Sequence, residues 1–215
     1  YFFAEMGYQL GLERLNEFAA KFGLGEHTGI ELGERVGQRH ENQPGEDQSP
    51  WAGFGQASQE YTPLQLANYI ATLVRGGERL DVHLLKNVTT FDNSAVLLDH
   101  QPEVLSDVGM SEETLATVKK GMGDLVTKGS VARDFADCIV SAGAKTGSAQ
   151  VGEENANGVF VCFAPFDEPE IAVAVVIEKG GSGAALASTA VEIVNAYFAG
   201  NDIGIVSVPE GALLP

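Results

Sequence analysis

Basic residues are scarce in this chain. Its 215 residues include 13 Lys and Arg against 30 Asp and Glu, which gives a formal net charge of −17 at pH 7. Such an acidic surface repels phosphate groups, which argues against nucleic acid or an anionic membrane surface as a direct partner. We interpret the acidic residues as an ordinary solvated surface. The apolar content of 44% is enough for one sizeable hydrophobic core.

Cysteine is rare as well, with Cys138 and Cys162 as the two examples. Both lie in or beside predicted strands, and the expected hairpin register places Cys162 opposite residues near 148, not opposite 138. We therefore predict two unpaired thiols that pack as small buried apolar groups. Long apolar runs are also missing: none could cross a bilayer, and no signal-peptide pattern precedes them.

Common metal and nucleotide motifs are absent. The histidines are scattered and show no metal-ligand spacing, so we predict no metal site and interpret them as surface or core side chains with hydrogen-bond partners. They are His27, His40, His83 and His100. The sequence contains no Walker A motif, no Rossmann glycine fingerprint and no Gly-x-Ser-x-Gly elbow.

The most informative stretch that is present runs over residues 141–151, Ser-Ala-Gly-Ala-Lys-Thr-Gly-Ser-Ala-Gln-Val. Its pattern predicts a strand, in which alternate side chains face opposite sides. Thr146 and Ser148 then share one face, and Gly147 between them leaves room for an approaching ligand. With the Lys145 ammonium and a row of backbone N–H groups, these hydroxyls could hold a carboxylate or an oxyanion.

The residues around this stretch predict an antiparallel meander. Its three strands are expected near 139–151, 158–165 and 170–178, and apolar residues at helical spacing predict a helix over 184–198. Upstream, residues 1–23 read as a helix in two pieces whose core face is formed by Leu12, Leu15, Phe18, Ala19 and Phe22. Residues 34–51 read as a long loop, and 79–99 as one or two strands.

Two further helices have clear start signals. Thr62 is a predicted N-cap, Pro63 occupies the first helical position, and Gln65 stands in capping-box register, so a helix should run from there to Arg75. A second helix should open at Ser111 and end at Gly129.

This order of elements resembles the end of the penicillin-binding protein transpeptidase domain, and is closest to the monofunctional, class B type. The resemblance covers residues 1–199. It implies an α/β (α+β) fold of the penicillin-binding protein/serine β-lactamase type, with an antiparallel sheet and packed helices, followed by a C-terminal tail at 200–215. Further stretches that carry it are Phe-Phe-Ala-Glu-Met-Gly at 2–7, Gly-Leu-Glu-Arg-Leu-Asn-Glu-Phe at 11–18, Gly-Gln at 55–56, Thr-Pro-Leu-Gln-Leu-Ala at 62–67, Phe-Val-Cys-Phe-Ala-Pro at 160–165 and Pro-Glu-Ile-Ala-Val-Ala-Val at 169–175.

Two motifs of that family are missing from the chain. No serine is followed three residues later by Lys, and none begins Ser-x-Asn. Ser130 comes nearest, but the residue three positions on is Arg133, whose permanent charge prevents it from acting as a neutral base. The resemblance therefore implies the C-terminal half of a catalytic domain, expected to be inactive alone.

The resemblance also implies roles for individual residues. Lys145, Thr146 and Gly147 would belong to the catalytic site, with Lys145 supplying positive charge. Thr146 and Ser148 would bind the carboxylate of the substrate or of a β-lactam, and the Ser148 N–H would be an oxyanion donor. The chain differs from many members in having Ser148 instead of Thr. It also has Asn-Gly-Val at 157–159, which calls into question the aromatic packing beneath the 141–151 strand.

For the intact protein, the resemblance implies a peptidoglycan D,D-transpeptidase that cross-links stem peptides and is a target of β-lactams. No cofactor is implied. A membrane glycosyltransferase is an implied partner through regions outside this chain, and the implied location is the extracytoplasmic face of the bacterial cell membrane, held by an N-terminal anchor absent here. Two alternatives stay open: a β-lactam-sensing receptor domain, and a non-catalytic module that binds a stem peptide or a partner.

Overall fold

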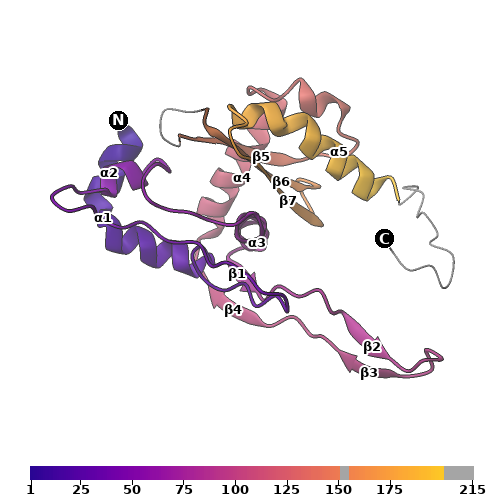
Figure 1. Ribbon diagram of the computed structural model, residues 1–215. Helices are drawn as coiled ribbons and strands as arrows, with labels where there is room; N and C mark the ends of the chain where they lie inside the picture. The colour runs from indigo at the N-terminus through magenta and orange to yellow at the C-terminus, as the bar shows by residue number, and fades with distance from the viewer. Residues whose placement is uncertain (151–154, 201–215) are drawn as a thin grey trace.

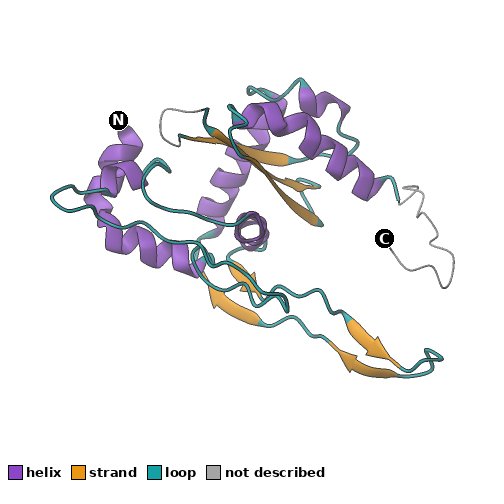
Figure 2. Cartoon of the chain, in the orientation of Figure 1, coloured by secondary structure: helices purple, strands orange, loops and turns teal. Residues whose placement is uncertain are grey.

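The computed structural model describes residues 1–150 and 155–200, and its centre is a three-stranded antiparallel sheet (Figures 1 and 2). The strands are β5 (Gly143–Ala149), β6 (Asn157–Ala164) and β7 (Ile171–Ile177), in the order β5-β6-β7. The predicted meander is therefore confirmed. The first strand begins at Gly143 rather than near 139, and an irregular stretch separates it from a turn of 3-10 helix, η1 (Asp134–Asp137). Residue 151, its expected end, lies outside the described residues.

The register of the first hairpin corrects one expectation. Cys162 lies opposite Ala144, and Ser148 lies opposite Gly158, so Cys162 is not placed near residue 148. The ladder already ends at the pair Ala149–Asn157. The connection is therefore longer than the strand predictions allowed, and connection length sets the register of a hairpin.

Both cysteines are free thiols, as predicted. Cys162 is buried in the core, and Cys138, which is half-buried, packs against the same group of residues. Burial, with a smaller contribution from the neighbouring Cys138, raises the pKa of the Cys162 thiol to about 12. Cys162 is therefore a neutral apolar group at physiological pH.

The sheet separates two hydrophobic layers, because successive residues of a strand face opposite sides. On one face, Ala144, Phe160 and Cys162 pack against the short helix η2 (Gly183–Leu186) and α5 (Ala187–Phe198). On the other face, Val161 and Phe163 pack against α3 (Pro63–Val74) and α4 (Glu112–Thr127). Figure 1 shows α5 on one side of the sheet, with α3 and α4 on the other.

The helix boundaries follow the predicted caps closely. Thr62 caps α3 in a complete capping box with Gln65, and Pro63 is the first helical residue. Ser111 caps α4, its hydroxyl accepting a hydrogen bond from the Thr114 N–H. Among the described residues, no helix is long and apolar enough to cross a membrane.

The first helix, α1 (Phe2–Lys21), is in two pieces as predicted, with a break at Gly11, where φ is 76°. Its predicted core face is wrong in part. Phe22, just beyond the helix, is buried, but the Phe18 side chain is 49% exposed. The reason is that α1 packs chiefly on α2 (Ser49–Ala52), through a close backbone contact between Gly7 and Gly53.

A two-stranded ribbon extends away from the central sheet (Figure 1). Near its base, β1 (Glu78–Leu80) pairs with β4 (Val104–Asp107), and farther out β2 (Asn87–Thr89) pairs with β3 (Val96–Asp99). The strands predicted within 79–99 are thus present, as is the long irregular stretch after residue 34, which ends in the short helix α2. The expected tail at 200–215 falls almost wholly outside the described residues.

Candidate active site

The four residues Lys145, Thr146, Gly147 and Ser148 lie in succession on β5, at the edge of the described sheet (Figure 1). Lys145 and Ser148 are exposed, whereas Thr146 and Gly147 are half-buried. The structure therefore brings all of the predicted site residues together on one accessible strand. An edge strand presents backbone groups that no neighbouring strand pairs, which suits it to binding an extended ligand.

Two carbonyl groups of β5 point away from its neighbour β6. The Ser148 carbonyl accepts a hydrogen bond from Gln56 Nε2 at 3.2 Å, and the Thr146 carbonyl accepts one from Lys145 Nζ. In an antiparallel ladder, the N–H and C=O of one residue point to the same side of the strand. The backbone N–H groups of Thr146 and Ser148 therefore also face the open edge of β5.

The two hydroxyls of the strand differ in their surroundings. Ser148 Oγ accepts a hydrogen bond from the Gly183 N–H at 3.1 Å, so it also anchors the start of η2. The Thr146 hydroxyl, by contrast, makes no hydrogen bond to any residue that the structure describes. Within the described residues, the Thr146 hydroxyl thus has its full donor and acceptor capacity, whereas Ser148 keeps its O–H donor and one of its two acceptor lone pairs.

Backbone packing behind the strand depends on two glycines. A Cβ on Gly183 would lie 2.2 Å from the Gly147 carbonyl oxygen and 2.4 Å from the Val159 carbonyl oxygen. Gly183 therefore rests directly on the β5–β6 ladder. On the opposite face, a Cβ on Gly147 would approach the Val159 Cβ at 3.3 Å, so Val159 fills the space beneath Gly147.

The charge at the site is the Lys145 ammonium. It forms no ion pair within the described part of the chain, and its one hydrogen bond goes to the neighbouring Thr146 carbonyl. An unpaired cation beside outward-facing N–H groups favours binding of a carboxylate or a developing oxyanion.

A separate pocket of about 720 Å³ lies along α4 and contacts the chain just before β5. Ser141 and Ala142 contribute to its wall, together with Phe135, Phe166 and the α4 side chains Lys119 and Asp124. None of the four residues from Lys145 to Ser148 lines it. The pocket is therefore distinct from the edge of β5.

Sequence reasoning missed two partners of the strand. Gln56 reaches Ser148 across 92 positions of sequence, and no local pattern signals that contact. Gly183 ends the Gly-Gly-Ser-Gly run at 180–183, which was a visible signal of close backbone approach. The histidines were expected to have hydrogen-bond partners, and that expectation is wrong in part, because His40 Nδ1 and His83 Nδ1 have none among the described residues. The sequence spacing also did not reveal that His83 and His100 lie in contact.

Comparison with known proteins agrees with this geometry. A model of the penicillin-binding protein transpeptidase domain matches residues 1–199. Penicillin-binding protein 2A of Bacillus subtilis (strain 168) is 34% identical over 186 residues, which cover 77% of this chain and 25% of that protein. Peptidoglycan D,D-transpeptidase MrdA of Escherichia coli (strain K12) is 30% identical over 233 residues, which cover 94% of this chain and 36% of that protein.

A solved structure shows the same fold. Penicillin-binding protein 2B from Streptococcus pneumoniae (strain R6) superimposes with a TM-score of 0.76 at 27% sequence identity, covering 89% of this chain and 33% of the other. The chain thus spans between a quarter and about a third of the length of these similar proteins. From the family match over residues 1–199, the relatives and the shared fold, we conclude that this chain belongs to the penicillin-binding protein transpeptidase domain family.

Proposed function

We propose that this chain forms the C-terminal part of a serine-type peptidoglycan D,D-transpeptidase. In the proposed reaction, a serine from an upstream Ser-x-x-Lys motif attacks the carbonyl of the terminal D-Ala-D-Ala bond of a stem peptide. An ester forms, the C–N bond breaks, and the terminal D-Ala leaves with a proton on its amine. The amine of a neighbouring stem peptide then attacks the ester, which forms the cross-link and frees the serine.

The observation that carries this proposal is the edge of β5 in the described sheet. An ammonium without an ion pair and a hydroxyl without a hydrogen bond, as far as the described residues go, lie there beside outward N–H groups. In the proposed site, the Thr146 hydroxyl and the Lys145 ammonium bind the substrate carboxylate, with the Ser148 O–H as a second donor. The Ser148 N–H donates to the oxyanion of the tetrahedral intermediate. Gly147 leaves room for the substrate backbone to approach the strand.

The proposal extends to ligands and location. β-Lactams would acylate the same serine, since the family is defined by penicillin binding. Stem peptides would be the natural substrate, and a membrane glycosyltransferase would be a partner through regions outside this chain. We place the protein at the extracytoplasmic face of the bacterial cell membrane, where its substrate is assembled, held by an N-terminal anchor.

The test uses the longer protein that contains both this chain and the Ser-x-x-Lys motif. Fluorescent penicillin should label it, and Lys145→Ala should lower the acylation rate about 100-fold, because one preorganised charge at the site is lost. Lys21→Ala is the matched control: Lys21 is an exposed lysine at the end of α1, far along the chain from β5, and its loss should leave the rate unchanged.

The chain of 215 residues gives the complementary measurement. Since it contains no Ser-x-x-Lys motif, incubation with penicillin should add no mass to it. A stoichiometric adduct on one of its serines would contradict the assignment of the nucleophile to an upstream motif. An unchanged acylation rate in Lys145→Ala would contradict the assignment of the site to β5.

A further inference from the structure

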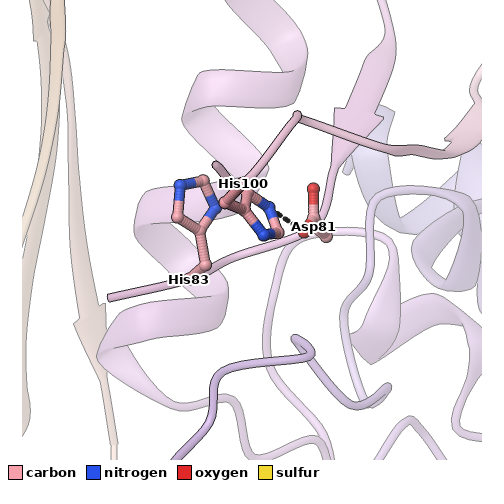
Figure 3. A group of neighbouring side chains, drawn as sticks. All are labelled: Asp81, His83 and His100. Carbon is pink, nitrogen blue, oxygen red and sulfur yellow. Dashed lines mark ion pairs between the residues drawn. The ribbon is translucent and has the colours of Figure 1, made fainter. Parts of the chain in front are cut away.

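Three side chains with metal-ligating atoms meet in the ribbon, between its two pairs of strands (Figure 3). Asp81 and His83 follow β1 on the outgoing arm, and His100 follows β3 on the returning arm. In an extended chain, residues two positions apart project from the same face, so Asp81 and His83 share one face of the arm. The neighbouring arm then places His100 against them.

The contacts within this cluster are close. One ligand atom from each of the three residues lies within 4.8 Å of the others. The His100 Nε2 and Asp81 Oδ2 atoms are 2.7 Å apart, and the ring centroids of His83 and His100 are separated by 3.7 Å. All three side chains are half-buried, with 27% of the His100 side chain and 16% of the Asp81 side chain exposed.

One ring nitrogen of the cluster, His83 Nδ1, is shielded from solvent and has no hydrogen-bond partner among the described residues. His100 Nε2 is also shielded, and it pairs with the Asp81 carboxylate at 2.7 Å. A shielded polar atom without a partner carries a free-energy cost, and a bound ion that accepts its lone pair removes it.

The surrounding hydrogen bonds hold the ligands in place without using the atoms in question. Asp81 Oδ1 accepts a hydrogen bond from the Glu103 N–H at 2.8 Å, which leaves Oδ2 directed at the cluster. The backbone N–H of His100 donates a hydrogen bond to the backbone carbonyl of Lys86 at 2.9 Å. The Glu31 carboxylate accepts hydrogen bonds from the N–H groups of Leu84 and Leu85, which fixes the chain after His83.

We propose that Asp81, His83 and His100 bind a Zn²⁺ ion that clasps the two arms of the ribbon at the base of the β2–β3 hairpin. Two imidazoles and one carboxylate form a donor set that zinc commonly takes, with water completing a tetrahedral shell. Zinc bonds of about 2.0–2.2 Å require the three ligand atoms to lie about 3–3.6 Å apart, so small side-chain rotations complete the site. The ion would stiffen the hairpin relative to the central sheet.

The experiment uses the full chain without a histidine tag, freed of metal with a chelator and titrated with ZnCl₂ in a calorimeter. We expect one Zn²⁺ per chain and a melting temperature that rises with added Zn²⁺. Co²⁺ in place of Zn²⁺ should give the visible absorption bands of a tetrahedral site, a readout that needs no variant.

Variants then assign the ligands. His83→Ala, His100→Ala and Asp81→Asn should each weaken Zn²⁺ binding by about 100-fold or more, since each removes a direct ligand. Asp81→Asn keeps an acceptor for the Glu103 N–H, so it is the mildest of the three for the fold. His27→Ala is the control: His27 is exposed and contacts Glu34, and its loss should leave binding unchanged.

The proposal would be overturned if no Zn²⁺ bound at about 100 μM metal, because a structural zinc site binds its ion far more tightly than that concentration requires. It would also be overturned by binding that survives in both His83→Ala and His100→Ala with unchanged affinity. Far-ultraviolet circular dichroism of each variant establishes that the chain is folded. The proposal concerns a site apart from β5, so either result leaves the transpeptidase proposal untouched.

Discussion

The Ser148 hydroxyl oxygen accepts a hydrogen bond from the Gly183 N–H at 3.1 Å. This bond joins β5 to the start of η2, and it gives Ser148 a structural task that Thr146, two residues earlier, does not have. Ser148→Ala should therefore lower the free energy of unfolding by about 1 kcal/mol, because the buried Gly183 N–H loses its partner. Urea denaturation of the wild type and the variant measures this difference.

Ser148→Thr serves as the control, since threonine keeps the oxygen at the same position of the side chain. It should retain most of the stability that Ser148→Ala loses. Equal stability of the wild type and Ser148→Ala would show that the Ser148–Gly183 bond contributes nothing to the fold.

The second prediction concerns the glycine that rests on the β5–β6 ladder. Gly183→Ala places a Cβ 2.2 Å from the Gly147 carbonyl oxygen, so the η2 backbone has to move away from the strand. Overpacking of this kind costs about 1–3 kcal/mol, and we expect a loss of stability at the upper end of that range. Thermal unfolding followed by circular dichroism measures the loss.

A matched glycine in α4 should respond in the opposite way. A Cβ on Gly121 meets no atom within 4 Å, and the residue is exposed within a helix. Gly121→Ala should therefore stabilise the chain by about 0.5–1 kcal/mol through helix propensity. Similar effects of both substitutions would contradict the close packing of Gly183.

Local patterns in the sequence predicted the parts of the fold that depend on local interactions. The capping box of Thr62 and Gln65 needs only four consecutive residues, and it is present as predicted. The remaining contacts of Gln65 were not predictable. The residue is 1% exposed, and its side-chain amide donates to the carbonyls of Glu26 and Val36 at 2.8 and 2.7 Å. Those partners belong to an irregular stretch whose path no periodicity defines.

In the candidate site, too, local sequence patterns predicted the local features and missed the contacts between distant segments. Alternation within one strand correctly placed Thr146 and Ser148 on a common face of β5. The Gln56 contact depends on how distant segments pack, and the register depends on the length of a connection, so neither could be read from the motif. His83 and His100 are brought together by the ribbon, although their spacing matches no metal motif.

A third prediction follows from charge pairing on α4. Asp124 lies between Lys120 and Lys128, with Nζ–O distances of 2.6 and 2.9 Å. The hydrogen bond from Lys120, reinforced by that from Lys128, lowers the pKa of Asp124 to about 2. A lowered pKa means that the pair stabilises the folded state above the unfolded value near 4, and that this stability is lost as the pH falls through about 2.

Asp124→Asn removes the titrating group and keeps its shape. The melting temperature of the wild type should exceed that of the variant at neutral pH by a small margin, because the pair is solvent-exposed. That margin should shrink between about pH 4 and about pH 2. A margin that stays constant over this window would show that the two ion pairs do not contribute to stability.

The last prediction concerns the free hydroxyl of β5 in the longer protein that carries the Ser-x-x-Lys motif. Thr146→Val keeps the β-branched shape and removes only the hydroxyl, which has no hydrogen-bond partner in the described chain. The free energy of unfolding should change by less than about 0.5 kcal/mol.

The rate of acylation by a fluorescent penicillin should fall about 10- to 100-fold, which is the effect of losing one hydrogen bond to a charged ligand group. Thr127→Val is the control: among the described residues, the exposed Thr127 hydroxyl bonds only to the Gly123 carbonyl of its own helix, so this variant should leave acylation unchanged. A residue that served the fold alone would give the reverse result for Thr146→Val, a lower melting temperature with a normal acylation rate, so measuring both quantities on each variant decides the role of Thr146.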